Sequence, residues 1–298
     1  MPDTSLRSRV SSAHRLFPQA PLSQPDALKV ARTQADQPCA NDVQLGLGLR
    51  EFRAFLQPKF DLRSGQVKAV EILARWQHPL RGVLGPENFI PLMESRQWLD
   101  ELLFEMLEQG LAYQLKLHHQ GRLLGLAFNL SQSQLSSSTL VDRLEERLRE
   151  HPLPPSAITF EVTEDGPADL CATTVKQLKR LSRLGIRLSL DDFGTGSSSL
   201  WRLCQVPFNE IKLAGEFTRL LDGTAHYPAI IRSTVALADD LGTQLVVEGI
   251  ETEQQRRRLL AMGVRIGQGF LCASPMSIEA FDRWISTPYR QSRPRSVF

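Results

Sequence analysis

An apolar stretch of the sequence ends in two adjacent aspartates, Asp191 and Asp192, which run directly into the glycine-rich residues 193–196. Alternate side chains of a strand point to opposite faces, so an Asp-Asp pair at a strand end is poorly suited to a hydrophobic core. An unpaired buried carboxylate is very unfavourable. A bound cation would compensate for the charge, and the pair therefore indicates metal-dependent chemistry.

Other strand-like stretches also end in polar side chains. Glu71 is the strongest case, because apolar residues surround it and it needs a buried cationic partner. In a barrel of parallel strands the carboxyl ends meet at one face, where active sites form. The remaining residues of this kind are Asn129, Glu161, Lys212, Glu248, Gln268 and, one turn after Glu248, Glu251. Their repetition along the chain predicts a metal-dependent active site at that face.

Hydrophobic patterning predicts eight strands, six of which alternate with helices. The expected strands cover residues 54–62, 67–76, 123–129, 158–163, 186–191, 210–213, 244–248 and 265–270. The expected helices cover residues 87–94, 98–118, 133–150, 168–184, 198–204, 227–241 and 252–262. Crossover helices imply a parallel sheet, and the length suits an α/β fold of the (β/α)8 TIM-like barrel type.

The first two strands are joined by a short connection that contains glycine, which predicts a hairpin and one antiparallel strand near the N-terminus. A doubly wound open sheet is the alternative architecture. No G-x-G-x-x-G motif follows the first strand, which disfavours dinucleotide binding. Gly185, Gly242 and Gly263 stand where helix C-caps are expected.

Composition divides the chain into three parts. Residues 1–45 are rich in Ser, Gln, Pro, Asp and Ala and are expected to form a flexible leader. Residues 46–287 are expected to form one catalytic domain. Residues 288–298, with several arginines, are expected to be a flexible tail.

The bulk properties are those of a globular protein, with 42% hydrophobic and 23% charged residues. The formal charge of +2 gives no support for a DNA or RNA polymer as partner. No apolar run is long enough to span a membrane and no signal peptide is evident, so a cytoplasmic location is expected. The four cysteines and six histidines lack metal-site spacing, so oxygen ligands and Mg²⁺ or Mn²⁺ are favoured.

These motifs resemble those of the EAL-domain cyclic di-GMP phosphodiesterases, as a stand-alone EAL domain. The resemblance covers residues 50–285 in family order. Its segments are residues 55–59 (FLQPK), 71–75 (EILAR), 128–131 (FNLS), 160–164 (FEVTE), 190–196 (LDDFGTG), 247–252 (VEGIET) and 268–270 (QGF). The family fold is a barrel with one antiparallel strand, in agreement with the predicted hairpin.

The resemblance implies a role for each matching residue. The first metal ion takes Glu71, Asn129, Glu161 and Asp191, and the second takes Asp191 and Asp192. Lys212 orients or polarises the attacking water, and Glu248 is the general base. Gln57 contacts a guanine and Arg75 a phosphate of the dinucleotide. Glu251 and Gln268 support the metals, and Glu164 anchors the loop of residues 193–199.

The implied reaction is hydrolysis of cyclic di-GMP to linear pGpG with two Mg²⁺ or Mn²⁺ ions, and the family implies a possible homodimer. Two departures from the family pattern matter. Ala214 replaces a usual aspartate near Lys212, and Ser197 replaces a usual aromatic residue. They leave open a catalytically weak or inactive receptor for cyclic di-GMP or for a protein.

The acidic residues are also compatible with two different interpretations. One is another kind of metal-dependent barrel enzyme, which would need the same acidic rim but not Gln57 and Arg75. The second is a purely structural network of salt bridges, in which Glu71 would pair with Arg75. Buried ion pairs are a poor route to stability, which disfavours the structural network.

Overall fold

The computed structural model describes residues 38–136, 138–163, 170–196, 199–221 and 223–286. The chain divides into two units, Met1–Pro38 and Cys39–Phe298. Nearly all of the first unit lies outside the described residues, as does the expected tail, so the fold described below is that of the second unit.

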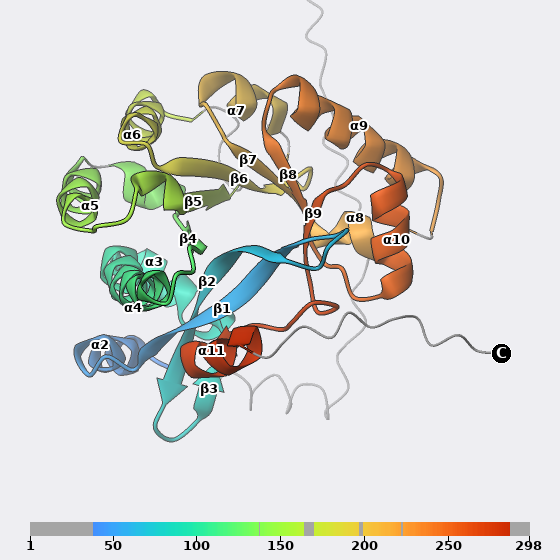
Figure 1. The fold of residues 1–298 in the computed structure, drawn as a ribbon. Helices are drawn as coiled ribbons and strands as arrows, with labels where there is room; N and C mark the ends of the chain where they lie inside the picture. The colour runs from blue at the N-terminus through green and yellow to red at the C-terminus, as the bar shows by residue number, and fades with distance from the viewer. Residues whose placement is uncertain (1–37, 137, 164–169, 197–198, 222, 287–298) are drawn as a thin grey trace, which may run out of the picture. The chain divides into compact units, whose positions relative to one another are not determined.

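In the described part of the chain, eight strands form a closed barrel (Figure 1). They are β1 (Phe52–Asp61), β2 (Val67–His78), β4 (Gly125–Asn129), β5 (Ile158–Thr163), β6 (Arg187–Phe193), β7 (Glu210–Leu213), β8 (Gln244–Val247) and β9 (Ile266–Gln268). Strand β1 is antiparallel to both of its barrel neighbours, β2 and β9, and all other barrel pairs are parallel. The predicted barrel with one antiparallel strand is confirmed, and the open sheet is excluded.

Helices surround the barrel on its outer side (Figure 1). The helices are α2 (Ala40–Gly48), α3 (Ile90–Arg96), α4 (Leu99–His119), α5 (Thr139–Arg149), α6 (Ala172–Arg183), α7 (Ser199–Gln205), α8 (Gly215–Arg219), α9 (His226–Asp240), α10 (Glu253–Ala261) and α11 (Ile278–Ser286). Short 3-10 turns cover Pro86–Asn88, Gln132–Ser136 and Pro155–Ala157. Two small strands, β3 (Gly82–Leu84) and β10 (Met276–Ser277), pair with β2 and β1.

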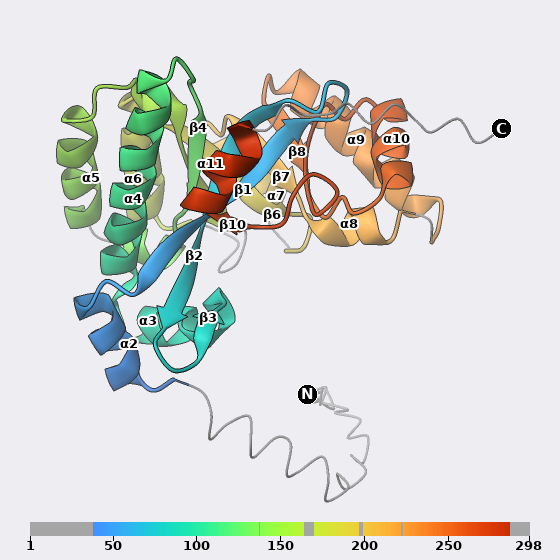
Figure 2. The same cartoon turned by 60° about the horizontal axis from the view of Figure 1, so that its bottom comes forward.

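Helix α2 corrects the predicted leader, which was expected to be flexible through residue 45. The helix begins at Ala40 and lies with α3 and β3 at the C-terminal end of β2 (Figure 2). Val43 is fully buried, and Gly46 lies so close to the Trp76 ring that a Cβ would approach it to 2.9 Å. A few well-packed residues anchor this helix, which composition alone does not reveal.

The expected helix ends are confirmed at three glycines. Gly185, Gly242 and Gly263 have φ values of +85°, +64° and +94°, which residues other than glycine rarely adopt. At the other end of α10, Thr252 accepts a hydrogen bond from the Gln255 amide while the Gln255 side chain accepts one from the Thr252 amide. This reciprocal cap satisfies amides that the first helical turn leaves unpaired.

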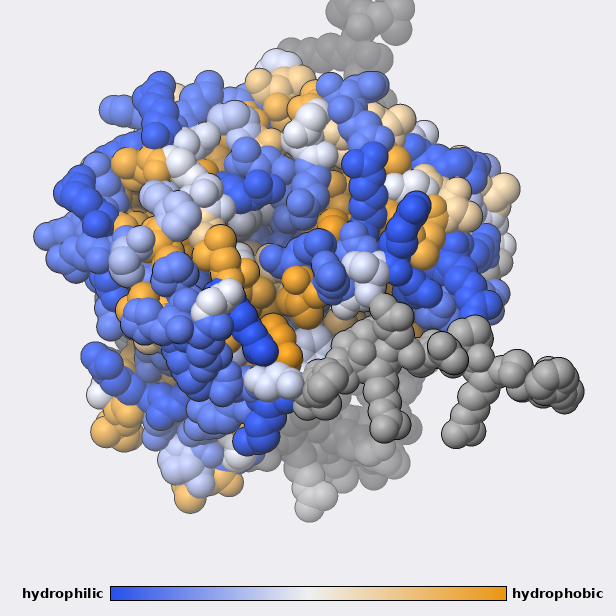
Figure 3. Space-filling view, viewed as in Figure 1, coloured by the Kyte–Doolittle hydropathy of each residue, from blue (hydrophilic) through white to orange (hydrophobic). Residues whose placement is uncertain are grey.

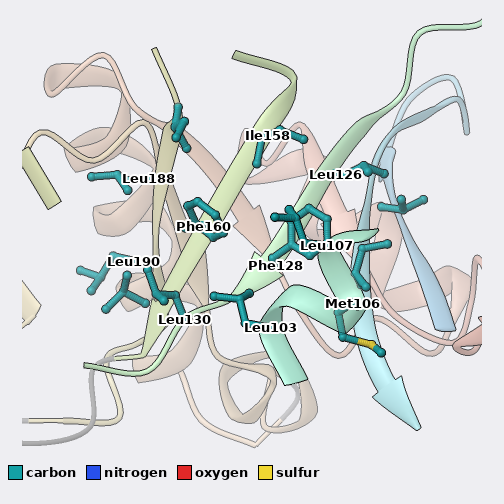
Figure 4. Packing of buried hydrophobic residues seen from close by; sticks show 14 of the residues in the cluster. Leu103, Met106, Leu107, Leu126, Phe128, Leu130, Ile158, Phe160, Leu188 and Leu190 are labelled. Carbon is teal, nitrogen blue, oxygen red and sulfur yellow. The ribbon is translucent and has the colours of Figure 1, made fainter. Parts of the chain in front are cut away.

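The main hydrophobic core lies between the barrel and its helices. Figure 4 shows Leu103 and Leu107 of α4 near Phe128 of β4, in one cluster with buried side chains of β5 and β6. Phe128 and Phe160 on neighbouring strands are both buried, with ring centroids 6.3 Å apart. Gly110 lets α4 approach closely, since a Cβ there would meet the Phe128 ring at 2.8 Å. This packing holds the strand ends in fixed relative positions.

The surface is mixed in character. On the face in Figure 3 hydrophilic residues dominate, and the hydrophobic ones lie in small separate patches. Within the described residues, none of the helices combines the length and the apolar character that crossing a membrane requires.

Glu105 on α4 gives a test of how burial affects this fold. Its Oε1 is buried without a hydrogen-bond partner among the described residues. Burial raises the pKa of Glu105 from 4.5 to about 7, although Arg53 and Arg50 act against this. Because the folded state holds this proton more tightly, its stability falls as pH rises from 4.5 toward 7.

We therefore expect Glu105→Gln to raise the free energy of unfolding at pH 8, by about 1 kcal/mol after allowing for partial exposure. At pH 4.5 the gain should be much smaller. Urea unfolding at both pH values measures this. The exposed Glu101→Gln on the same helix is the control and should change stability by less than about 0.5 kcal/mol. An equal gain for Glu105→Gln at both pH values would contradict the assignment.

Candidate active site

The carboxyl ends of the parallel strands bring the predicted polar residues to one mouth of the barrel. The strand register pairs Asn129 with Glu161, and it pairs Thr163 with Asp191. Strand β1 runs the other way and sets Gln57 opposite Glu71. Residues far apart in the sequence thus meet because the strand register brings them to the same level of the barrel.

Lys212 lies at the centre of this group and is 1% exposed. Among the described residues, four carboxylates lie within 3.4 Å of its Nζ. The distances are 2.7 Å to Glu161, 2.8 Å to Glu248, 2.9 Å to Asp191 and 3.4 Å to Glu71. These contacts fix the ammonium group, because burial without them would be very unfavourable.

A second buried lysine, Lys59, lies deeper in the barrel. Its Nζ is 2.6 Å from Glu161 Oε1, while Glu161 Oε2 is 2.7 Å from Lys212. Lys59 also forms an ion pair with Glu210, which accepts a hydrogen bond from the Ser189 hydroxyl at 2.9 Å. Glu161 is therefore held by a lysine on each oxygen.

Glu71 is surrounded by amide side chains as well as by Lys212. Asn129 Nδ2 donates to Glu71 Oε1 at 2.9 Å, and Gln268 Nε2 donates to Glu71 Oε2 at 2.7 Å. Gln268 Nε2 also lies 3.1 Å from Gln57 Oε1. The Glu71–Arg75 pair of a purely structural network does not form among the described residues, since Arg75 instead donates to the carbonyl of Ala74.

Three carboxylates at the mouth, from Asp191, Asp192 and Glu248, offer oxygens that all lie within 4.8 Å of one another. Asp192 has a φ of +54°, a left-handed conformation that aspartate tolerates better than most residues. This turn directs two consecutive carboxylates toward the same site, which an extended strand would not do.

Burial perturbs the acidity of these groups. Burial raises the pKa of Asp191 to about 7, with Glu161 and Glu248 adding to the effect and Lys212 opposing it. Burial likewise raises the pKa of Glu71 and of Glu248. Burial also acts to raise the pKa of Glu161, but Lys212 and Lys59 outweigh it and lower that pKa to about 2.

The donor set suits divalent cations. Among the described residues the mouth holds five carboxylates around one lysine, Lys212, an excess of four negative charges when all of them are ionised. The carboxylates are Glu71, Glu161, Asp191, Asp192 and Glu248. Gln268 Oε1 is buried without a partner among the described residues and is a further oxygen donor. Such oxygen-rich sites suit hard divalent cations.

Two cavities open at the mouth. The larger, of about 720 Å³, is lined by Arg75, by Glu71 and by apolar side chains of α4. The smaller, of about 340 Å³, is lined by Gln57, Glu251, Lys212, Glu248 and Gln268, among others. Asp191 and Asp192 line both cavities, so a ligand across them would pass over the carboxylates.

Most predicted site residues are thus brought together. Glu164, and Ser197 with its expected effect on the loop, are outside the described residues. Sequence reasoning missed Lys59 and Glu210 as members of the network. The signal for Lys59 was its spacing of two from Gln57, which gives both side chains the same facing on a strand.

Comparison with known proteins shows the family of this chain. The family model described as EAL domain matches residues 40–275. The chain belongs to the EAL domain family. The EAL domain of this chain is 44% identical over 247 residues to the cyclic di-GMP phosphodiesterase RocR of Pseudomonas aeruginosa, covering 83% of this chain and 63% of RocR. It is 33% identical to the cyclic di-GMP phosphodiesterase PA2567 of the same organism, covering 78% of this chain and 40% of that protein.

Solved structures resemble the EAL domain closely. A phosphodiesterase structure named PaMucR, in complex with c-di-GMP, matches with a TM-score of 0.75 at 34% identity, covering 81% of this chain and 98% of that one. An EAL domain protein from Listeria monocytogenes matches with a TM-score of 0.74 at 26% identity, covering 84% and 98%. This chain spans less than two thirds of the two curated relatives named above.

Asp192 provides a test of cation binding at this EAL domain. Asparagine also tolerates the left-handed backbone, so Asp192→Asn should leave stability without metal nearly unchanged. Removing one carboxylate should weaken Mn²⁺ binding at least about tenfold, which removes about 1.4 kcal/mol of Mn²⁺-dependent stabilisation. Thermal unfolding with and without MnCl2 measures this.

The exposed Asp240→Asn, on α9, is the matched control and should retain the full Mn²⁺ effect. The same rise in Tm for Asp192→Asn and the wild type would show that this cluster binds no Mn²⁺.

Proposed function

We propose that this EAL domain hydrolyses cyclic di-GMP to linear pGpG and so lowers the level of that second messenger. The arrangement of carboxylates around Lys212, open to two adjoining cavities, is the observation that carries the proposal. The names of the relatives support it, since RocR and PA2567 are both cyclic di-GMP phosphodiesterases. The reaction adds water across one phosphodiester, which breaks one P–O bond and leaves a phosphomonoester and a hydroxyl.

The proposed cofactors are two Mg²⁺ or Mn²⁺ ions. The first would be held by Glu71, Asn129, Glu161 and Asp191, and the second by Asp191 and Asp192. When bound, such ions neutralise the phosphodiester and make a water more acidic. The raised pKa values of Asp191 and Glu71 fit this assignment, because a cation would displace the protons that burial favours.

The remaining roles belong to the side chains of this chain. Glu248 accepts the proton of the attacking water, and the rise in its pKa on burial makes it a stronger base for this step. Lys212 orients that water and stabilises negative charge on the phosphoryl oxygens. Gln57 contacts a guanine, and Arg75 presents its donor fork to a phosphate from the wall of the larger cavity.

Three further residues have supporting roles in this proposal. Gln268 holds Glu71 through its amide. Glu251 lines the smaller cavity at its exposed rim. Glu164 is proposed to anchor the segment of residues 193–199.

The competing function is a cyclic di-GMP receptor or protein-interaction module without hydrolysis. Ala214 motivates it, because an aspartate there was expected to orient Lys212. Lys212 Nζ already lies within 2.9 Å of three carboxylates, so its position does not depend on residue 214. Ala214 is fully buried and precedes the first residue of α8. These observations favour the enzyme.

The direct test is incubation of the purified chain with cyclic di-GMP and Mg²⁺ or Mn²⁺, followed by chromatography of the products. We expect metal-dependent formation of pGpG. Glu248→Gln should lower kcat by at least about 100-fold, the usual contribution of a general base. Glu71→Ala should abolish product formation, and the exposed Glu146→Gln on α5 should retain full activity. Binding of cyclic di-GMP without any product would establish the receptor instead.

We also propose that the domain acts in the cytoplasm as a homodimer. All four cysteines are free, which suits a reducing compartment. Helices α7 and α9 border an apolar groove of about 680 Å³ that includes Phe193, Leu200, Ile230 and Leu237. Leu200 and Ile230 are exposed, and pairing with a second copy would bury them.

Size-exclusion chromatography with light scattering tests the dimer. The wild type should have twice the mass of the chain, and Ile230→Glu should convert it to a monomer because a charge would enter the apolar groove. Leu80→Glu is the control, since Leu80 is 90% exposed on the β2–β3 turn. A monomeric wild type would contradict the proposal.

A further inference from the structure

Lys59 is a fully buried cation for which the proposed reaction has no use. It belongs to the FLQPK segment of β1, and its side chain is 1% exposed. Lys59 is not among the described residues that line the larger or the smaller cavity. A ligand in those cavities would not touch it.

Charges of alternating sign run down the inside of the barrel from its mouth. Asp191 and Glu248 contact Lys212, Lys212 contacts Glu161, and Glu161 contacts Lys59. The row ends where Lys59 pairs with Glu210, which Ser189 and Gln244 also contact. Lys59 thus reaches the mouth through one carboxylate, Glu161.

The contacts of Glu161 explain how Lys59 acts at a distance. Lys59 occupies Oε1 at 2.6 Å and Lys212 occupies Oε2 at 2.7 Å, in a side chain with no exposure to water. Without Lys59, Oε1 would be a buried acceptor lacking its ammonium donor, which is unfavourable. The carboxylate would then turn toward Lys212 and draw it away from Asp191 and Glu248.

A purely structural role for Lys59 is a poor explanation of this arrangement. Buried ion pairs contribute little to stability compared with apolar residues of similar size. A lysine between two carboxylates therefore indicates a task that an apolar side chain would not perform, such as fixing the direction of Glu161.

We propose that Lys59 is a positioning residue, which fixes Glu161 so that Lys212 stays in contact with Asp191 and Glu248. The kinetic part of this inference rests on the proposed phosphodiesterase function, because it assigns Lys212 a role in the reaction. The predicted effect of Lys59 on the position of Lys212 does not depend on that function.

Lys59→Met is the test, since methionine has a similar length and no charge. It should lower kcat about ten- to hundredfold, as loss of a residue behind a reacting group commonly does. KM for cyclic di-GMP should stay within about twofold, because Lys59 lies outside both cavities. An unchanged kcat would overturn the proposal.

Two further variants separate positioning from loss of stability. Glu210→Gln keeps an acceptor for Lys59 and leaves the Lys59–Glu161 contact in place, so its kcat should match the wild type. The double variant Lys59→Met, Glu210→Gln removes the unpaired Glu210 charge and should be more stable than Lys59→Met alone, yet its kcat should remain low. Recovery of kcat in the double variant would show that Lys59 only neutralises Glu210, and would overturn the proposal.

A crystal structure of Lys59→Met gives a reading independent of activity. Lys212 Nζ should lie beyond about 3.5 Å from Asp191 or from Glu248, the limit of a hydrogen bond, compared with 2.9 Å and 2.8 Å in the wild type. Retention of both contacts would overturn the proposal even if the wild-type chain hydrolyses nothing. An inactive wild type with a displaced Lys212 would reject the proposed function and uphold the role of Lys59.

Discussion

The burial of Lys212 among carboxylates is the interaction on which the rest of the site depends. A lone ammonium group in a protein interior would lose its proton, and a lone cluster of carboxylates would gain several. In this cluster Lys212 stays charged at 1% exposure, and its charge holds the pKa of Glu161 low and opposes the rise in the pKa of Asp191. The negative and positive charges do not cancel, because acidic groups outnumber the lysines. Additional positive charge is therefore favourable at the mouth of the barrel.

The antiparallel strand β1 enters this arrangement from the opposite direction. In a parallel strand the residues in the barrel interior come before those at the mouth. Strand β1 starts near the mouth and runs inward, so Gln57 stands opposite Glu71 while Lys59 stands one layer lower, opposite Gln268 on β9. Strand β1 therefore supplies a contact at the rim and, two residues later, a cation in the interior. Strand β7 does the reverse, with Glu210 in the interior two residues before Lys212 at the mouth.

Residues at strand ends were predictable from the sequence because their neighbours were apolar. Strands β5 and β7 match their predicted limits of 158–163 and 210–213, and Asp191, Lys212 and Glu248 lie together at the mouth as expected. Lys59 was not predictable in this way, because its partners Glu161 and Glu210 lie 102 and 151 positions later in the chain. Short elements such as α8 and α11 were missed as well. The five residues of α8 are too few to show a helical period. In α11, Ile278, Phe281 and Ile285 do stand at helical spacing, and sequence reasoning missed that signal.

Strand β9, which closes the barrel, determines where the barrel opens locally. It has three residues, and its ladder with β8 joins only Val246 to Ile266 and Val247 to Gly267. Local opening requires the least free energy where the ladder is shortest, so backbone amides of β9 are placed to exchange with solvent before those of β5 or β6. Gln268, the last residue of this strand, bonds across the mouth to Glu71 on β2. Any ligand that orders Gln268 and Glu71 therefore also stabilises the position of β9 in the barrel. A ligand bound at the mouth thus slows local opening between β8 and β9.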